Sequence, residues 1–179
     1  MIQPWKFIRE EIEYENAYVK VIKRVYEMPD GRQQDYFIRD GVGDVASIVA
    51  LTKEGKFLLA REFRPGPGVV MDELPGGMID HGEESLAGAM RELLEETGYT
   101  GKFVHVTSAF LSAYSMGKKH CYVSYEAEKT HDTDHDHNEF IEVVLKSPED
   151  FQRQLELGDL TDLDSALLGW KYLKEKGLI

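Results

Sequence analysis

Alternating apolar and polar positions near the N-terminus predict strands. Residues 17–26 and 33–39 are rich in β-branched and aromatic side chains, which favour extended structure. Between them lies Pro29-Asp30-Gly31, a sequence typical of tight turns. We therefore expect a β-hairpin at the start of the chain, which could form a small subdomain.

Two further segments are apolar almost without interruption. Residues 45–51 and 56–63 flank the short turn at residues 53–55, which predicts a second pair of strands. Continuous apolar character indicates that both faces of these strands are buried. Proline and glycine at residues 65–68 then interrupt the ladder before a short strand that ends at Leu74-Pro75.

At residues 86–97 the spacing of apolar residues changes to that of an α-helix. One stripe of this segment carries Leu86, Ala89, Met90, Leu93 and Leu94, and Gly98 follows as a stop. Strands are expected again at residues 103–110, 120–128 and 141–146.

The C-terminal part predicts two helices. Ser147 is placed as an N-cap with Pro148 at the first helical position, so a helix should run from there toward Leu157. A final helix should end at Gly177. Strands come first and the helices do not alternate regularly with them, which predicts an α+β fold or mixed α/β/α layers.

Composition narrows the possible functions. The chain has 179 residues, and Lys plus Arg against Asp plus Glu gives 21 − 33 = −12. This charge disfavours nucleic-acid binding, so an anionic ligand must be held by a few placed cations or by metal ions. The single cysteine, Cys121, allows no internal disulfide and no thiolate zinc cage. No signal peptide or membrane span is expected, which favours a cytoplasmic protein.

The predicted helix at residues 86–97 carries a group of acidic side chains. Glu92, Glu95 and Glu96 lie along one edge at spacings of three and four, where like charges destabilise a helix. A divalent cation would reverse that cost, and oxygen ligands at this spacing suit Mg²⁺ or Mn²⁺. The alternative is a solvated charged face.

The spacing of the surrounding residues resembles the signature of the Nudix hydrolases. Tyr99 is its one unusual position, because a bulky aliphatic residue is more common there. The matching positions include Gly77, Glu83, Arg91, Glu92, Leu93, Glu95, Glu96 and Gly98. The resemblance implies an α/β/α sandwich with a mixed sheet, and hydrolysis of a nucleoside diphosphate linked to another group.

The resemblance also implies a role for each position. Glu92, Glu95, Glu96 and the backbone carbonyl of Gly76 would bind Mg²⁺, with Mn²⁺ as a possible substitute, and Glu95 and Glu96 would thereby be catalytic. The structural positions would be Gly77, Glu83, Arg91 and Gly98. Among these, Glu83 and Arg91 would form an ion pair, and Gly98 would take a left-handed conformation.

Two sequences outside the signature are similar to the ADP-ribose and nucleotide-sugar pyrophosphatases. These are REFRP at residues 61–65 and ELPGG at residues 73–77. That branch implies a homodimer, with residues 1–42 as an N-terminal β-rich region that assists dimerisation and substrate binding, and residues 43–179 as the hydrolase domain. Arg64 is the candidate phosphate clamp, with a surface arginine as the alternative. Arg61 and Glu73 are further substrate-binding candidates.

The chain departs from the ADP-ribose pattern in one loop. It has Ser112-Ala113-Tyr114 where Ser-Pro-Gly is usual, and Lys118 where an acidic residue is expected. ADP-ribose therefore stays one possibility beside another nucleotide sugar such as GDP-mannose, whose phosphate Lys118 or Lys119 would contact. Exposed lysines are the alternative.

Relatives of this branch imply a glutamate base, and Glu139 occupies its place, with Glu142 as the neighbouring alternative. Residues 131–137 are rich in His and Asp, but we expect a mobile polar loop there rather than a metal site. Trp5 and Tyr18 are candidates for stacking on a base.

Together these features predict a Mg²⁺-dependent pyrophosphohydrolase that cleaves a nucleotide sugar to a nucleoside monophosphate and a sugar phosphate. One alternative is a Nudix hydrolase of nucleoside triphosphates or dinucleoside polyphosphates. Another is a catalytically silent nucleotide-sensing module, although the intact glutamates argue against it.

Overall fold

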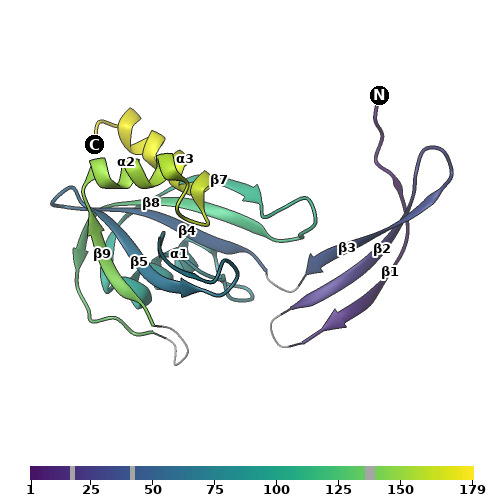
Figure 1. Cartoon of the computed structure of the whole chain (residues 1–179), viewed down its shortest axis with the longest axis horizontal. Helices are drawn as coiled ribbons and strands as arrows, with labels where there is room; N and C mark the ends of the chain where they lie inside the picture. The colour runs from purple at the N-terminus through teal and green to yellow at the C-terminus, as the bar shows by residue number, and fades with distance from the viewer. Residues whose placement is uncertain (17–18, 41–42, 136–139) are drawn as a thin grey trace.

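The computed structural model describes residues 1–16, 19–40, 43–135 and 140–179. It contains two separate sheets (Figure 1). The first is antiparallel, with order β1-β2-β3, and its strands are β1 (Lys6–Glu15), β2 (Lys20–Glu27) and β3 (Gln33–Asp40). The predicted hairpin is thus present as β2 and β3, but the sequence analysis missed β1.

The second sheet is mixed and has six strands in the order β6-β5-β4-β8-β7, with β9 paired to β5. Strands β4 and β8 are parallel, and the other pairs are antiparallel. The strands are β4 (Val45–Thr52), β5 (Phe57–Arg64), β6 (Val69–Glu73), β7 (Tyr99–Phe110), β8 (Lys118–Lys129) and β9 (Glu142–Lys146).

Three helices cover this second sheet. Helix α1 (Ser85–Thr97) packs on one face, whereas α2 (Pro148–Leu157) and α3 (Leu163–Glu175) pack on the other. Strand β4 serves both layers because side chains alternate along a strand: Ile48 contacts the α1 cluster and Val49 the α2–α3 cluster. The predicted α/β/α arrangement and the burial of β4 on both faces are confirmed.

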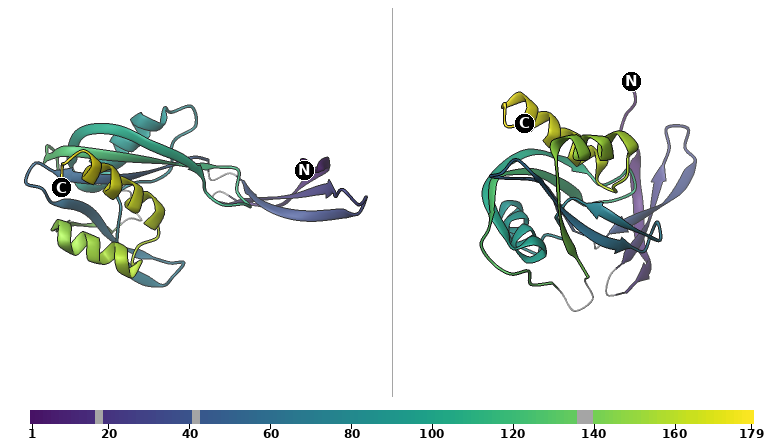
Figure 2. Two further views of the ribbon diagram at one scale, coloured as in Figure 1. Left: turned by 90° about the horizontal axis from the view of Figure 1, so that it is seen from above. Right: turned by 60° about the vertical axis from the view of Figure 1, so that its left-hand side comes forward.

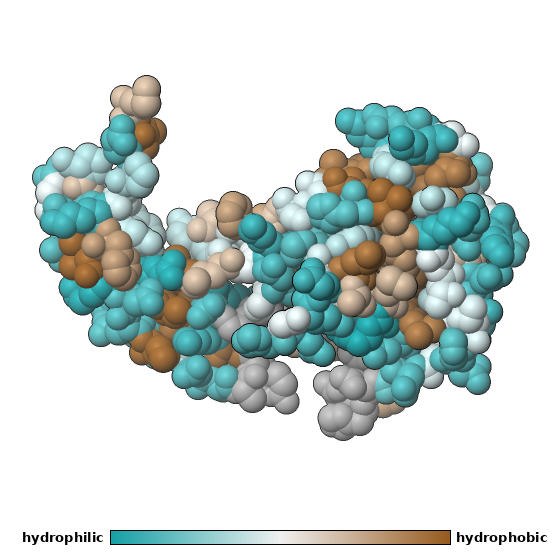
Figure 3. Space-filling model, turned by 180° about the vertical axis from the view of Figure 1, so that it is seen from behind, coloured by the Kyte–Doolittle hydropathy of each residue, from teal (hydrophilic) through white to brown (hydrophobic). Residues whose placement is uncertain are grey.

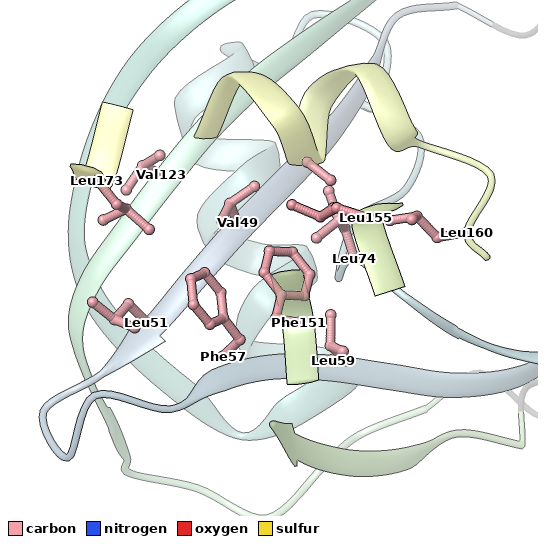
Figure 4. Packing of buried hydrophobic residues seen from close by; sticks show 11 residues of the cluster. Val49, Leu51, Phe57, Leu59, Leu74, Val123, Phe151, Leu155, Leu160 and Leu173 are labelled. Atoms are coloured by element: carbon pink, nitrogen blue, oxygen red, sulfur yellow. The ribbon is translucent and has the colours of Figure 1, made fainter. Parts of the chain in front are cut away.

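The larger apolar cluster lies between the sheet and the C-terminal helices (Figure 4). Phe57 of β5 stacks on Phe151 of α2 with ring centres 4.2 Å apart, and Trp170 of α3 lies 5.4 Å from the Phe57 ring. Cys121 is also buried, and burial raises the pKa of its thiol to about 11. The thiol therefore acts as a small core residue.

Local signals end and begin the helices where expected. Gly98 follows α1 with φ 75° and donates its N–H to the carbonyl of Leu94. The Ser147 hydroxyl accepts a hydrogen bond from the N–H of Asp150 at the start of α2. These contacts fix the ends of the two helices.

The three-stranded sheet projects from one side of the larger body (Figure 2). Strand β3 meets the body through backbone hydrogen bonds between Arg39 and the segment that joins β7 to β8, namely Tyr114 and Met116. The Tyr36 and Tyr114 rings also stack, with centres 6.4 Å apart. The division into domains at residue 42 stays a prediction, because residues 41–42 lie outside the described residues.

Candidate active site

A cavity of about 560 Å³ opens beside the C-terminal half of α1. The glycine-rich segment before α1, the end of β5 and the segment after β8 complete its wall. Several residues singled out from the sequence line it together: Arg64, Gly76, Gly77, Arg91, Glu92, Glu95 and Glu96. The fold thus gathers the acidic helix, the glycines and two arginines around a single space.

The three glutamates of α1 differ in their exposure. The side chains of Glu92 and Glu95 are 15% and 42% exposed, whereas Glu96 is buried at 7%. The Glu96 carboxylate accepts a hydrogen bond from the N–H of Gly76 at 3.0 Å. This bond ties the last turn of α1 to the glycine-rich segment.

Arg91 connects the acidic side chains to the loop before the helix. Its guanidinium donates to Glu83 at 3.1 Å, to Glu92 at 2.9 Å and to Glu95 at 3.0 Å. It also donates to the carbonyl of Met78 at 3.0 Å. These acceptors, with Glu83 first, raise the pKa of Arg91, and the same bond lowers the pKa of Glu83. The ion pair that the family resemblance implied is present, and Arg91 also offsets charge on α1.

Two adjacent glycines bring the backbone close to its neighbours. Gly76 has φ 149°, and a Cβ there would clash with the carbonyl oxygen of Ala46 on β4. A Cβ on Gly77 would lie 2.7 Å from the carboxylate of Glu92. Any larger residue at these positions would therefore push the loop off the sheet or displace a candidate ligand.

The chemistry of this donor set fits a hard divalent cation. Glu92, Glu95, Glu96 and the Gly76 carbonyl offer only oxygen ligands, which Mg²⁺ prefers, and Gly77 leaves the carboxylate of Glu92 the space that a Cβ would fill. Among the described residues, no three Asp, Glu, His or Cys side chains already converge as a metal cage. Arg91 is bonded to two of these carboxylates, so a cation would compete with Arg91 for their oxygens.

Arg64 supplies positive charge on the opposite wall. Its Nη2 atom lies 3.0 Å from Glu62, and its buried Nε has no hydrogen-bond partner within the part of the chain that the structure describes. A neighbouring cleft of about 430 Å³ shares Arg64 with the cavity and is also lined by Arg39. The sequence analysis missed Arg39, because only the packing of β3 against the body brings it here.

Two substrate-binding candidates lie outside the cavity. Arg61 is bonded to Asp72 at 2.6 Å and lines an adjoining cleft, which shares Glu62 and His135 with the cavity. Glu73 is 1% exposed, and its carboxylate accepts hydrogen bonds from the N–H and hydroxyl of Thr161 at 3.0 and 2.7 Å. The prediction that Glu73 binds substrate is therefore wrong, since its carboxylate is buried and fixes the segment before α3.

Lys118 and Trp5 also lie away from the cavity in a single chain. The ammonium of Lys118 is 5.8 Å from the ring centre of Phe110, and neighbouring Lys119 is bonded to two aspartates near the start of α3. The Trp5 ring packs against Tyr36 of β3, with centres 5.9 Å apart. Neither expected contact with a substrate is supported by these positions.

Of the base candidates, Glu139 lies outside the described residues, as does Tyr18 among the stacking candidates. Glu142 is at the start of β9, where a carboxylate oxygen lies 3.7 Å from Arg61. The assignment of the base therefore stays a prediction.

Asp134 and His135 are cavity residues that the sequence analysis did not select. The N–H of Asp134 donates to the carbonyl of Glu95 at 2.9 Å, and His135 Nε2 lies 3.0 Å from the carbonyl oxygen of Glu96. These contacts satisfy carbonyls in the last turn of α1, which lack partners within a helix. We had expected a mobile polar loop, but its described part is hydrogen-bonded to the helix.

Comparison with known sequences gives consistent matches. The family model described as NUDIX domain matches residues 41–164. An ADP-ribose pyrophosphatase of Bacillus subtilis (strain 168) is 32% identical over 145 residues, which cover 78% of this chain and 77% of that protein. An ADP-ribose pyrophosphatase of Saccharomyces cerevisiae is 40% identical over 93 residues, and the match covers 46% of this chain and only 40% of that relative.

A solved structure extends the likeness to the whole fold. The crystal structure of an ADP compounds hydrolase matches with a TM-score of 0.86 and 20% identity, covering 100% of this chain and 99% of that one. The match includes the projecting N-terminal sheet as well as the larger body. None of the helices in the described part of the chain has the length and apolar character that a membrane crossing needs.

Proposed function

This chain belongs to the Nudix hydrolase family, and we propose that it cleaves the diphosphate of an ADP sugar or a related nucleotide sugar. The products would be a nucleoside monophosphate and a sugar phosphate. The observation that carries the proposal is the cavity in which the glutamates of α1 and Arg64 face the same space. The similarity to ADP-ribose pyrophosphatases of Bacillus subtilis and Saccharomyces cerevisiae supports this substrate class.

The proposed roles follow from the charge of a diphosphate. Its oxygens repel a nucleophile, so a catalyst must neutralise them as charge moves to the leaving group. Arg64, which lines both the cavity and the adjoining cleft, would bind phosphate oxygens with its guanidinium, and Arg39 would bind in that cleft. These two arginines offset the repulsion expected from a chain of charge −12.

The glutamates of α1 would bind the cofactor. Mg²⁺ held by Glu92, Glu95, Glu96 and the carbonyl of Gly76 would supply positive charge and lower the pKa of a bound water. Through its bond to the Gly76 N–H, Glu96 would keep the helix and the loop together. Glu139 stays the predicted base that removes the proton from the attacking water.

A substrate panel tests the proposed activity. ADP-ribose, GDP-mannose, a dinucleoside polyphosphate and nucleoside triphosphates would each be incubated with Mg²⁺, and the products identified by chromatography. We expect a nucleoside monophosphate and a sugar phosphate in equal amounts. Inorganic pyrophosphate from triphosphates as the dominant product would favour the alternative enzyme, and no turnover of any compound would favour a sensing module. The Glu96→Gln variant from the same preparation controls for contaminants.

We further propose that the protein is a homodimer formed through the N-terminal sheet. A small sheet needs a hydrophobic face or a packed helix for independent stability, and no helix of the described residues packs on this one. Yet β1 and β3 expose large apolar side chains: Phe7, Ile12, Tyr14 and Phe37 are each more than half exposed. Figure 3 shows such apolar surface on the projecting sheet. A second copy packed on the face that carries Phe7 and Ile12 would cover that face. A cytoplasmic location stays a prediction, supported by the single buried thiol.

A further inference from the structure

Four polar side chains form a hydrogen-bonded chain outside the cavity. His105 Nε2 and His120 Nδ1 each lie 2.8 Å from the hydroxyl oxygen of Ser108, and His120 Nε2 lies 2.9 Å from a carboxylate oxygen of Asp44. Ser108 and His105 are exposed, whereas the His120 side chain is only 15% exposed. The proposed function uses none of these residues.

The donor and the acceptor of each bond in this hydrogen-bonded network can be assigned, starting from Asp44. An ionised carboxylate only accepts hydrogen bonds, so His120 donates to it from Nε2. With His120 neutral, its Nδ1 must then accept from Ser108, which in turn accepts from His105. The bond from His120 also lowers the pKa of Asp44 below its ordinary value, as does a bond from the N–H of Lys118.

Asp44 joins this hydrogen-bonded network to the glycine-rich loop of the cavity. Its carbonyl accepts the N–H of Ile79 at 2.9 Å, and the next residue, Val45, forms a β-bridge with Met78. Further along β4, the N–H of Ala46 donates to the carbonyl of Gly77 at 2.9 Å. The loop that contains Gly76 and Gly77 is thus paired to β4, and Asp44 is the outer end of that pairing.

The side chain of Asp44 also fastens β4 to β8 at the same point. Parallel pairing of the two strands begins with Val45 opposite Lys119, and the carboxylate of Asp44 accepts the N–H of Lys118 at 2.8 Å, one residue beyond this pair. The backbones approach closely there, since a Cβ on Gly117 would clash with the carbonyl of Gly43. Asp44 therefore links three segments: β4, β8 and the loop.

We propose that His120 is a positioning residue for the cation-binding loop and acts through Asp44. The bond from Nε2 holds the Asp44 carboxylate against β8, and the Asp44 carbonyl then holds Ile79 and the adjoining loop. The link to a cation rests on the proposed function, because that loop supplies Gly76. The link to the loop itself does not depend on it.

Two measurements test this proposal. Amide exchange at Ile79 reports the bond to Asp44 directly, and Mn²⁺ titration followed by electron paramagnetic resonance reports the affinity of the cation site without turnover. In His120→Ala we expect exchange at Ile79 to be about fivefold faster, since a hydrogen bond of ordinary net strength is lost. We also expect the Mn²⁺ dissociation constant to rise by about the same factor.

Three further variants separate positioning from packing. His120→Gln keeps a donor near the Nε2 position and should restore both values to within about twofold of the unmodified protein. Asp44→Asn removes the charged acceptor and should behave as His120→Ala does. His105→Ala, at the exposed outer end of the chain, should change neither value.

Unchanged exchange at Ile79 in both His120→Ala and Asp44→Asn would overturn the proposal. Failure of His120→Gln to differ from His120→Ala would overturn the route through Asp44. If the unmodified protein binds no Mn²⁺, the proposed function fails, and the exchange at Ile79 decides the positioning role alone.

Discussion

The two sheets of this molecule are stabilised in different ways. The six-stranded sheet buries apolar side chains on both faces, and Ile48, Val49 and Leu58 are completely inaccessible to solvent. In the described part of the three-stranded sheet, only Ile22 and Val25 are buried to a similar degree. Its other cross-strand contacts are mostly ion pairs, in which Lys20, Lys23 and Arg24 of β2 face acidic side chains of β1 and β3.

This difference suggests that the two regions perform different tasks. Burial of apolar surface contributes most of the folding free energy, whereas exposed ion pairs contribute little. The larger body can therefore hold a highly charged cavity, because its core stabilises the surrounding elements. The N-terminal sheet has well-specified strand pairing but exposed apolar faces, which suits assembly better than chemistry.

The largest expected effect tests the body. Replacing Glu96 by Gln should lower turnover by at least about a hundredfold, because a charged cation ligand is lost. The fold should persist, since a Gln side-chain oxygen can still accept the N–H of Gly76. Turnover and the circular dichroism melting curve would be measured together, with Glu156→Gln on α2 as a matched control. Near-normal turnover would contradict the role of Glu96.

The next effect tests the N-terminal sheet. Phe7→Ser combined with Ile12→Ser removes two side chains from one face of the sheet, opposite Tyr26 and Ile22 of β2, that are 51% and 56% exposed in a single chain. If a second copy covers them, the dimer dissociation constant should rise by about a hundredfold, given the usual contribution of a buried apolar side chain. Sedimentation equilibrium measures this. Leu157→Ser, at an exposed apolar position on α2, should leave assembly unchanged, and an equal response would remove the sheet from the interface.

A tenfold effect on KM is expected at Arg64, which shares a cleft with Arg39 of the N-terminal sheet. Arg64→Ala should raise KM by about tenfold with a smaller change in kcat, because a charged hydrogen bond to phosphate is lost in both the ground and transition states. Arg153→Ala on α2 serves as the control for loss of one positive charge. A fall in kcat at unchanged KM would mean that Arg64 acts only in the transition state.

The smallest effect compares ion pairs in the two sheets. Burial raises the pKa of Asp72, but bonds from Arg61 and Lys146 outweigh it and lower the pKa below the ordinary value. Ionised Asp72 therefore stabilises the fold at neutral pH, and this contribution is lost as the pH falls through the lowered pKa.

Asp72→Asn should accordingly reduce the free energy of unfolding at pH 7 by about 1 kcal/mol, and the reduction should shrink toward pH 3. Urea unfolding at both pH values measures the change. Glu11→Gln, which removes a more exposed partner of Lys23 in the N-terminal sheet, should have a smaller effect. A pH-independent cost at Asp72 would show that its hydrogen bonds matter more than its charge.

Features set by neighbouring residues were predictable from the sequence. The end of α1 at Gly98 and the start of α2 at Ser147-Pro148 depend on contacts within one turn, so local residue types determine them. The position of Glu92, Glu95 and Glu96 along one edge of α1 follows from helical spacing alone.

Features that depend on distant contacts were not predictable. Strand β1, with the sequence KFIREEIEYE, has no apolar run, and it forms a strand against the basic side chains of β2. Arg39 and His135 reach the cavity region only after β3 and the segment following β8 pack against the body. Glu73 was misjudged because its place next to the glycines gave no information on its burial.

The contacts of Arg91 bear on how folding and metal binding are related in this protein. Since its guanidinium donates to Glu83, Glu92 and Glu95 and offsets part of their charge, we expect the acidic edge of α1 to fold without an ion. Synthesis and loading with metal would then be separate events, unlike those of small domains that are unfolded until zinc arrives. If Mg²⁺ is the cofactor, as proposed, its removal should abolish activity and leave the protein folded.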